Sequence, residues 1–395
     1  MKLVIDCYIN HDKTITKKNR RMRFNLSSTA LSSRLLTLSR VPASKNSLAI
    51  LDCFRFGVHN NQLTITASDN ENVMWNVLNL DECDGEGDFC VNSKTILNAV
   101  RELPEQPLSL EVNFDEMKIS INYQNGNYGF PINSSEEWPA LTPVDDNAVS
   151  LSVTADALLG GLSRSLFATA QEELRPVMNG IYFDLTPEYL AVVASDGHKL
   201  VRNQYLTVKS ETPASFIMPK KPATLLKNVL SKDGGDVVIR FDGRAAEVNY
   251  GDGVLYCRLI EGHYPNYNAV IPSDNPNLLT IDRKILLSAV RRMLPFASDT
   301  SELIRFHLEN GKLELSAQDI DFATNAKESI TCEYNGAPMS IGFKGSSIIE
   351  ILSNLESDNI TIQLADPSRP GVIVPEDQPE NESVTMLAMP MLLEN

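Results

Sequence analysis

The sequence contains none of the short motifs that mark the common classes of enzyme. It has no G-x-x-x-x-G-K-[ST] phosphate loop, no strand followed by G-x-G-x-x-G, no H-E-x-x-H and no G-x-S-x-G. The best catalytic candidates are Ser195, Asp196 and His198, but neighbours in one loop rarely reach the geometry that a catalytic triad needs. The sequence therefore predicts a protein that is not an enzyme, and turnover through His198 is the least favoured alternative.

Metal-binding, disulfide and membrane patterns are missing as well. The six cysteines show no C-x-x-C spacing, and the histidines are not clustered, so neither zinc nor a disulfide framework is expected in a chain of this size. No apolar run approaches the roughly 20 residues that a membrane helix needs. The apolar run Leu3-Val-Ile5 is too short for a secretory signal. We expect no metal, no cofactor and a reducing, cytoplasmic setting.

Basic residues are scarce, because 35 Lys and Arg stand against 51 Asp and Glu and the formal net charge is −16. Taken alone, this balance argues against nucleic-acid binding. The basic residues are concentrated, however, in segments that read as helices, and the rest of the chain is strongly acidic. Ordinary solvated helix faces are the alternative interpretation. Three basic pairs lie two turns apart on one helix face, and a further basic residue lies on the first helix: Lys94 and Arg101, Lys220 and Lys227, Lys284 and Arg291, and Arg34.

What the sequence does contain is one strand pattern that occurs three times. Leu63–Asp69, Leu190–Asp196 and Leu313–Asp319 each alternate apolar and polar residues and end in aspartate, as a half-buried strand before a turn would. The pattern recurs about every 125 residues, which is the length of a domain and too long for a solenoid unit. We predict three copies of one domain, preceded by an extension that is expected to be disordered: 22–147, 148–275 and 276–395, after 1–21.

Each repeat also carries two helical segments. One family of helices starts at Ser27, Thr154 and Asp282, where a side-chain oxygen can accept a hydrogen bond from an unpaired backbone N–H. A second helix follows later in each repeat, and turns such as Asn125-Gly126 separate short strands. The predicted class is α+β, with two helices packed on antiparallel sheets in each of three tandem domains. The acidic, Pro-rich stretch 366–382 is expected to be an exposed loop between the last two strands.

Several short segments resemble the bacterial sliding clamps, the beta subunits of DNA polymerase III. The resemblance covers residues 22–395 and implies a ring of two identical subunits, joined head to tail around double-stranded DNA without sequence preference. It also implies a processivity factor that tethers the replicative polymerase, the clamp loader and repair proteins through short peptides, away from any membrane. The segments that carry it are Asn179-Gly-Ile-Tyr-Phe183, Ala194-Ser-Asp-Gly-His-Lys-Leu200, Gly262-His-Tyr-Pro-Asn-Tyr267 with Val270-Ile-Pro272, Ile341-Gly-Phe343 and Met389-Pro-Met391.

The resemblance assigns residues to three surfaces. Lys45 and Arg175 match basic loop residues of the family, so they join the helix residues named above as the DNA-facing set. At the subunit interface, Tyr128 and Phe130 match apolar edge-strand residues, and Phe296 matches an apolar residue that faces them. The partner-peptide pocket is expected at Met178, Ser195, Gly197, His198, Lys199, Leu200, Pro265, Val270, Leu387, Met389, Pro390 and Met391.

The chain departs from the family pattern at two places near the expected pocket. The family often ends in Met-Pro-Met-Arg-Leu, whereas this chain ends in Leu392-Leu-Glu-Asn395. Ala269 stands where a basic residue is common. Both departures affect polar details of peptide recognition. A three-domain scaffold that binds proteins without encircling DNA is the alternative from another functional class.

Overall fold

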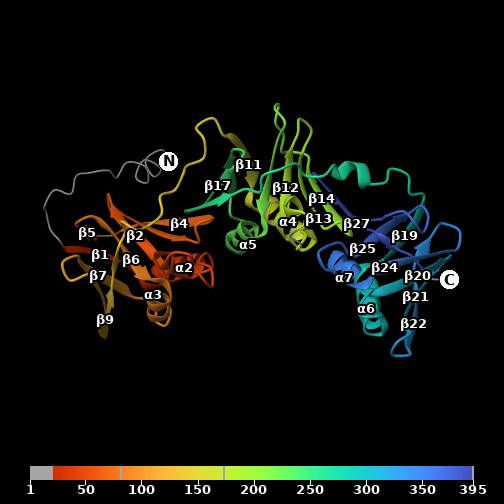
Figure 1. Ribbon diagram of the computed structural model, residues 1–395, viewed down its shortest axis with the longest axis horizontal. Coiled ribbons are helices and arrows are strands. Elements are labelled where there is room, and N and C mark those ends of the chain that lie inside the picture. The colour runs from red at the N-terminus through yellow and green to blue at the C-terminus, as the bar shows by residue number, and fades with distance from the viewer. Residues whose placement is uncertain (1–20, 81, 172–173, 394–395) are drawn as a thin grey trace. The chain divides into compact units, whose positions relative to one another are not determined.

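The structure is a computed structural model that describes residues 21–80, 82–171 and 174–393 (Figure 1). The expected disordered extension, 1–21, lies outside these residues except for Arg21, the first residue of strand β1 (Arg21–Ser27). No helix among the described residues is long and apolar enough to span a membrane. The chain divides into two compact units, and the division falls inside the second predicted repeat. Unit 1 is Met1–Ser152, Asn228–Leu230 and Gly234–Arg258, and unit 2 is Val153–Lys227, Ser231–Asp233 and Leu259–Asn395.

Unit 1 contains two antiparallel sheets, in the orders β5-β1-β7-β8-β9 and β10-β6-β2-β3-β4-β18-β17-β16-β11. Helices α2 and α3 contact each other; α2 packs on β1, β3 and β4, and α3 packs on β2 and β6. The bounds are α2 Ser28–Leu38, η1 Ala49–Asp52, β2 Cys53–His59, β3 Gln62–Ser68, β4 Asn72–Asn79, β5 Glu82–Asp84, β6 Gly87–Asn92, α3 Ser93–Val100, β7 Pro107–Asn113, β8 Lys118–Tyr123, β9 Gly126–Pro131, β10 Asn133–Ser134, β11 Val149–Thr154, β16 Asp236–Phe241, β17 Ala245–Tyr250 and β18 Gly253–Arg258.

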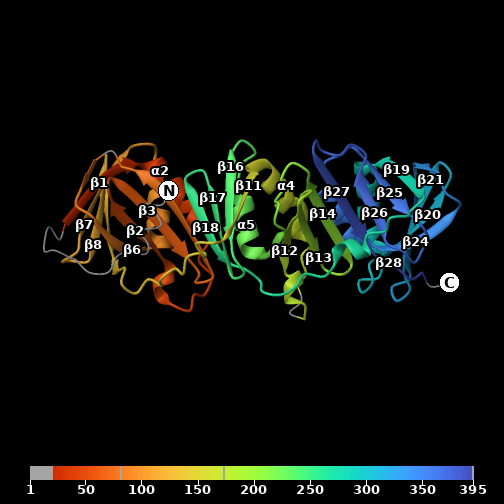
Figure 2. The same cartoon turned by 90° about the horizontal axis from the view of Figure 1, so that it is seen from above.

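Unit 2 also has two antiparallel sheets, in the orders β15-β12-β13-β14-β27-β26-β25-β19-β23 and β22-β21-β20-β24-β28. Figure 2 shows β14, β27, β26 and β25 side by side in that order. The bounds are α4 Ala155–Ser165, η2 Leu166–Ala168, η3 Pro176–Met178, β12 Gly180–Leu185, β13 Leu190–Ser195, β14 Lys199–Tyr205, β15 Ala214–Pro219, α5 Lys220–Val229, η4 Tyr267–Val270, β19 Asn277–Asp282, α6 Arg283–Met293, η5 Leu294–Phe296, β20 Leu303–Glu309, β21 Lys312–Asp319, β22 Thr324–Thr331, β23 Glu333–Tyr334, β24 Met339–Lys344, α7 Gly345–Ser353, β25 Asn359–Leu364, β26 Gly371–Pro375, β27 Glu382–Ala388 and β28 Pro390–Met391.

The three predicted repeats share one order of elements: a strand, a helix, three strands, a strand, a helix and three strands. The order runs β1-α2-β2-β3-β4-β6-α3-β7-β8-β9, then β11-α4-β12-β13-β14-β15-α5-β16-β17-β18, then β19-α6-β20-β21-β22-β24-α7-β25-β26-β27. The short strands β5, β10, β23 and β28 are additions to this plan. The predicted α+β class with three tandem copies is therefore confirmed.

The first helix of each repeat begins where its capping residue predicts. The side chains of Ser27, Thr154 and Asp282 each accept a hydrogen bond from the backbone N–H three residues later. Each cap satisfies one of the donors that a helix start leaves unpaired, a contribution of about 1 kcal/mol. Local sequence therefore sets these helix starts.

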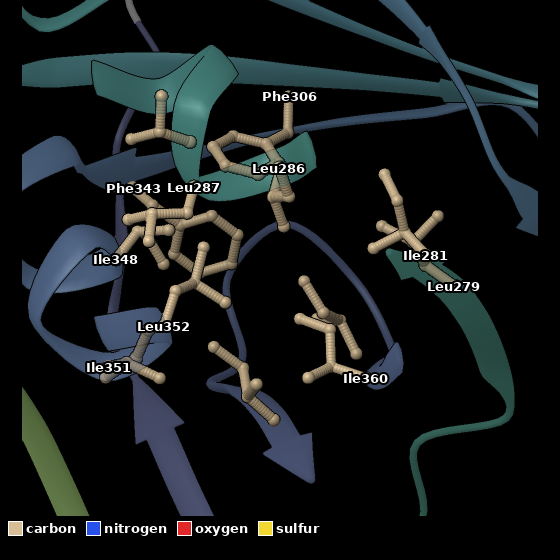
Figure 3. Close-up of a cluster of buried hydrophobic side chains, with 14 of the residues drawn as sticks. Leu279, Ile281, Leu286, Leu287, Phe306, Phe343, Ile348, Ile351, Leu352 and Ile360 are labelled. Atoms are coloured by element: carbon tan, nitrogen blue, oxygen red, sulfur yellow. The ribbon is translucent and has the colours of Figure 1, made fainter. Parts of the chain in front are cut away.

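The core of unit 2 explains why helices α6 and α7 lie against the strands around them. Figure 3 shows Leu286 and Leu287 of α6 together with Ile348, Ile351 and Leu352 of α7, among side chains from β19, β20, β24 and β25. Strands β20 and β24 contribute Phe306 and Phe343, whose rings meet edge to face with centroids 5.3 Å apart. Burying one such aliphatic or aromatic side chain stabilises the fold by roughly 1.5–3 kcal/mol. The polar faces of the two helices are left for other contacts.

One predicted element is wrong. The stretch 366–382, expected as a loop, contains strand β26 (Gly371–Pro375), which pairs with both β25 and β27. Its residues 371–373 are buried, so the strand lies inside the nine-stranded sheet. Proline near each end suggested a loop, but Pro370 lies just outside β26 and Pro375 ends it, where proline is tolerated in a sheet.

Candidate functional site

The C-terminal tail brings together residues that lie far apart in the sequence. Strand β27 runs antiparallel to β14, with Leu387 opposite Leu200, and the backbone N–H of Met389 donates to the carbonyl oxygen of His198 at 2.8 Å. Beyond this contact, Pro390 and Met391 form β28 and pair with β24. The tail therefore links the second repeat to the sheet that contains β24, and it places Leu387 and Met389 beside β14 and the loop after β13.

The loop between β13 and β14 is held by its own side chains. The Asp196 carboxylate accepts the backbone N–H groups of His198 and Lys199, each at 2.9 Å, and Gly197 has φ +90°, a conformation that favours glycine. The Ser195 hydroxyl donates to the carbonyl oxygen of Lys199 at 2.8 Å and accepts from the N–H of Gly197. Asp69 and Asp319 bind backbone N–H groups in the same way, so the repeated aspartate is a turn residue.

The side chain of Lys199 is turned into the protein. Its Nζ atom lies 2.6 Å from Asp196 and 3.0 Å from Glu350 of α7, and only 9% of the residue is exposed. Burial opposes the charged form of both groups. Their mutual hydrogen bond and attraction nevertheless raise the pKa of Lys199, to which Glu350 contributes, and lower the pKa of Asp196, which also accepts two backbone N–H groups. Lys199 therefore fixes the loop to α7 and does not present its charge to solvent.

Two further segments lie beside this loop. A Cβ atom placed on Gly197 would lie 3.2 Å from Nη1 of Arg175, and one placed on Gly262 would lie 2.8 Å from Val177 in η3. Leu200 and Leu387 share a buried cluster with Tyr267, the first residue of η4. The segments around 175–178, 195–200, 262–270 and 387–391 are thus drawn together within unit 2.

The apolar members of this group form two classes. Met178, Leu200 and Leu387 are at most 5% exposed, whereas Val270 and Met389 keep 49% and 40% of their surface exposed. His198 and Pro265 are also exposed. Exposed apolar side chains beside a buried apolar base are typical of a surface that receives an apolar group from a partner. This arrangement is the candidate partner-binding site.

The predicted DNA-facing residues differ in how free their charges are. Arg34 forms an ion pair with Asp252, Arg101 with Glu102 and Lys284 with Asp358. The other six are exposed and form no ion pair with the described residues: Lys45, Lys94, Arg175, Lys220, Lys227 and Arg291. On α5 and α6 these cations lie opposite the buried residues of the helix.

The predicted interface residues lie at or near the ends of sheets. Tyr128 and Phe130 belong to β9, the last strand of its sheet, and their rings are 6.2 Å apart. Phe296 ends η5, directly after α6, and is 39% exposed. Strand β22 is the last strand of another sheet. Among the described residues, β9 and β22 each pair with a neighbour on one side only.

Sequence reasoning missed the charged residues that hold the site in place. Glu350 and the ion pair of Arg164 with Glu382 were not singled out, although Arg164 reaches Glu382 across the β14–β27 pairing at 2.5 Å. No local pattern marks such pairs, because their members are separated by most of a domain or more in the sequence. Only the repeated position of the arginines in the first helices could have drawn attention to them.

Comparison with protein families gives matches over nearly the whole chain. The N-terminal domain of the DNA polymerase III beta subunit matches residues 22–142, its central domain matches 153–266, and its C-terminal domain matches 268–392. The bounds of the three repeats, 22–147, 148–275 and 276–395, stay a prediction.

Individual relatives and solved structures agree with the family matches. The beta sliding clamp of Caulobacter vibrioides (strain NA1000 / CB15N) is 23% identical over 380 residues, which is 94% of this chain and all of the relative. The beta sliding clamp of Synechococcus elongatus is 29% identical over 316 residues, 78% of this chain and 82% of the relative. Crystal structures of the Pseudomonas aeruginosa sliding clamp bound to griselimycin and of the Bacillus subtilis sliding clamp superpose with TM-scores of 0.88 and 0.87, at 23% and 18% identity; they cover 94% and 95% of this chain, and all of each solved chain.

Proposed function

Because the chain belongs to the family of DNA polymerase III beta subunits, we propose that it is a sliding clamp that closes into a ring of two subunits around duplex DNA. In this role it is a processivity factor: it tethers the replicative polymerase, and other DNA-processing proteins, through short peptides. The observation that carries the proposal is the repeated domain plan, in which β9 of the first repeat and β22 of the third each pair with a neighbour on one side only among the described residues.

Ring closure follows from how the repeats already join within the chain. Strand β4 of the first repeat pairs with β18 of the second, and β14 of the second pairs with β27 of the third. Strand β22 holds the same place in the third repeat as β4 and β14 hold in the first and second. Strand β9 holds the same place in the first repeat as β18 and β27 hold in the second and third. A head-to-tail pairing of β22 with β9 of a second subunit would satisfy both edges and close a two-subunit ring. Tyr128, Phe130 and Phe296 are assigned to that interface.

A ring holds DNA by topology, so its direct contacts need not be strong. We assign the basic helix faces and the loop residues Lys45 and Arg175 to the DNA side, where they contact phosphates and not base edges. The remainder of the acidic chain repels DNA, which keeps the protein from binding tightly elsewhere. This division of charge suits a protein that slides.

The candidate partner-binding site of unit 2 is assigned to peptide docking. Val270 and Met389 are exposed apolar groups, and Met178, Leu200 and Leu387 are buried apolar groups of the same segments; a flexible methionine can adapt to different anchors. We expect an extended peptide to place one or two large apolar side chains there. The Pseudomonas aeruginosa sliding clamp, whose fold is similar, has been crystallised bound to griselimycin.

No catalytic step is assigned to the chain, because the groups that could act are engaged in holding a turn. The Ser195 hydroxyl is bound to the backbone, and the Asp196 carboxylate is shared by two backbone N–H groups and the Lys199 ammonium. We place the protein in the cytoplasm, the compartment of bacterial DNA replication. The free thiols of Cys53, Cys83, Cys90, Cys257 and Cys332 suit a reducing compartment.

Retention on closed DNA tests the ring directly. Protein incubated at high concentration with nicked circular DNA, then washed in high salt, is expected to stay bound, because a ring cannot leave a circle without opening. Cutting the same DNA once with a restriction enzyme should release it within minutes. Gel filtration of labelled protein with the DNA measures both states. Equal retention on circular and linear DNA, or none on either, would favour a scaffold that does not encircle DNA.

Salt dependence tests the DNA-facing assignment. Replacing Lys227 with alanine should lower the slope of log affinity against log salt by about 0.9 if its ammonium contacts one phosphate. Lys312→Ala is the matched control, because Lys312 lies on strand β21 and already pairs with Glu314; its slope should stay unchanged. Fluorescence anisotropy with duplex DNA measures the slopes. Identical slopes for the parent and Lys227→Ala, or a strong preference for one DNA sequence, would contradict the assignment.

A further inference from the structure

The two joints between repeats within the chain are built in the same way, by pairing a strand of one repeat with the last strand of the next. Strand β4 pairs with β18 at the first joint, and β14 pairs with β27 at the second. Strands β4, β14 and β22 occupy the same place in their repeats, and the register of each with the preceding strand identifies equivalent residues. Ile65, Val192 and Leu315 each stand four residues before the repeated aspartate, and their cross-strand partners are Asn76 on β4, Asn203 on β14 and Glu328 on β22. Asparagine therefore occupies this position at both joints, and glutamate replaces it at the open edge.

An arginine from the first helix of a repeat crosses each joint to reach an acid of the next repeat. At the first joint, Arg34 of α2 forms an ion pair with Asp252, the residue before β18. At the second, Arg164 of α4 lies 2.5 Å from Glu382 of β27 and also donates to Asn203 at 2.8 Å. The side chains of Arg164 and Glu382 are 13% and 17% exposed, so this pair is largely shielded from solvent. Both ion pairs add electrostatic attraction to the hydrogen bonds between the strands.

At the open edge, the equivalent arginine is held within its own repeat. Arg292 of α6 and Arg164 of α4 lie the same number of residues after their helix caps, Asp282 and Thr154. It binds both carboxylate oxygens of Glu328 on β22, through Nε at 2.9 Å and through Nη2. The acid that comes from the neighbouring repeat at the two joints is thus supplied here by the edge strand itself.

The strand expected to meet this edge offers no acid in the matching place. Asp252 precedes Gly253, which pairs with Tyr250 across the β17–β18 turn. Asn125 precedes Gly126, which pairs with Tyr123 across the β8–β9 turn in the same way. The equivalent of Asp252 in the first repeat is therefore Asn125, an uncharged residue that is exposed.

We propose that the seam of the closed ring, where β22 of one subunit meets β9 of the other, lacks the arginine–carboxylate pair that crosses both joints within each chain. Glu328 keeps Arg292 in its own subunit, and Asn125 of the second subunit offers no charge to compete for it. These three residues make the seam weaker than the joints and set how readily the ring opens there. This inference rests on the two-subunit ring proposed above.

The combined change Asn125→Asp with Glu328→Asn would rebuild the arrangement of the joints at the seam. Arg292 would then face an asparagine on its own strand and a carboxylate on the second subunit. An exposed ion pair strengthens an association by up to about fivefold. We expect about threefold for each seam, hence about ninefold tighter dimerisation, because a closed two-subunit ring contains two seams. Subunit exchange, followed by energy transfer between labelled subunits, and sedimentation equilibrium measure this.

The single variants complete the comparison. Asn125→Asp alone should give no gain, because Glu328 still holds Arg292 and repels the new carboxylate. Asn61→Asp with Glu328→Asn is the matched control, since it adds the same charge at an exposed residue between β2 and β3, outside β9, and should also give no gain. Glu328→Gln can replace Glu328→Asn if the latter impairs folding. Independent effects of the two changes, or a gain equal to that of the Asn61→Asp control, would overturn the inference while leaving a parent dimer intact. A parent protein that sediments only as a monomer would overturn both this inference and the proposed ring.

Discussion

Replacing Phe296 with aspartate is expected to convert the dimer into monomers. Phe296 is an exposed apolar residue at the end of η5, and we assign it to the seam between subunits. A charge buried there without a partner would cost roughly 3 kcal/mol at each seam. Because the ring has two seams, the dissociation constant should rise by a factor on the order of 10⁴. Sedimentation velocity across a range of protein concentrations measures the shift.

The control for this change is Leu206→Asp. Leu206 follows β14 and is 44% exposed, so it offers a similarly exposed apolar side chain away from β9 and β22. The Leu206 variant should remain dimeric and should stay on circular DNA. If the Phe296 variant also remains a dimer at the same concentrations as the parent, Phe296 does not belong to the seam.

Truncating Met389 to alanine is expected to weaken peptide binding by roughly 1–4 kcal/mol, the range for a central anchor of an interface. Met389 is exposed, yet its backbone is fixed to His198, so the loss should come from the side chain and not from movement of the tail. Deleting Met389–Asn395 should abolish stimulation of a partner polymerase. Dimerisation and retention on circular DNA should be unaffected, because neither assigned surface includes the tail. Calorimetry with a clamp-binding peptide measures the affinity.

Met117→Ala is the matched control for the tail change. Met117 is 38% exposed, close to the 40% of Met389, and lies in unit 1. Its truncation removes a similar side chain from a different surface and should leave peptide affinity unchanged. Equal affinities of the parent and the Met389→Ala protein would remove the pocket assignment, and with it the tethering role.

At the peptide site, the sequence supplied the candidate residues and the structure distinguished between them. The two terminal methionines would be assigned to a hydrophobic core on composition alone, and only the resemblance to a family made them candidate anchors. The structure then separates the candidates by exposure, with Met389 accessible and Leu387 buried. The structure also turns Lys199 inward onto Asp196 and Glu350. From the sequence, Lys199 was expected to line the pocket.

The sequence by itself determined what depends on neighbours along the chain. The alternating strands that end in Asp69, Asp196 and Asp319 could be recognised because side-chain periodicity and turn capping act over a few residues. The helix starts at Thr154 and Asp282 follow from the same local chemistry. These repeated local patterns are what established three copies of one domain.

Only the tertiary structure decided which distant segments meet. Burial of its apolar residues placed β26 inside a sheet although Pro370 precedes it and Pro375 ends it. The pairing of β14 with β27 brought Arg164 to Glu382 and the tail to His198. Such contacts depend on the free energy of packing whole sheets together, which no single local segment determines. The same packing leaves β9 and β22 with a neighbour on one side only in the described chain, because the domain that would pair with the other side belongs, in our proposal, to a second subunit.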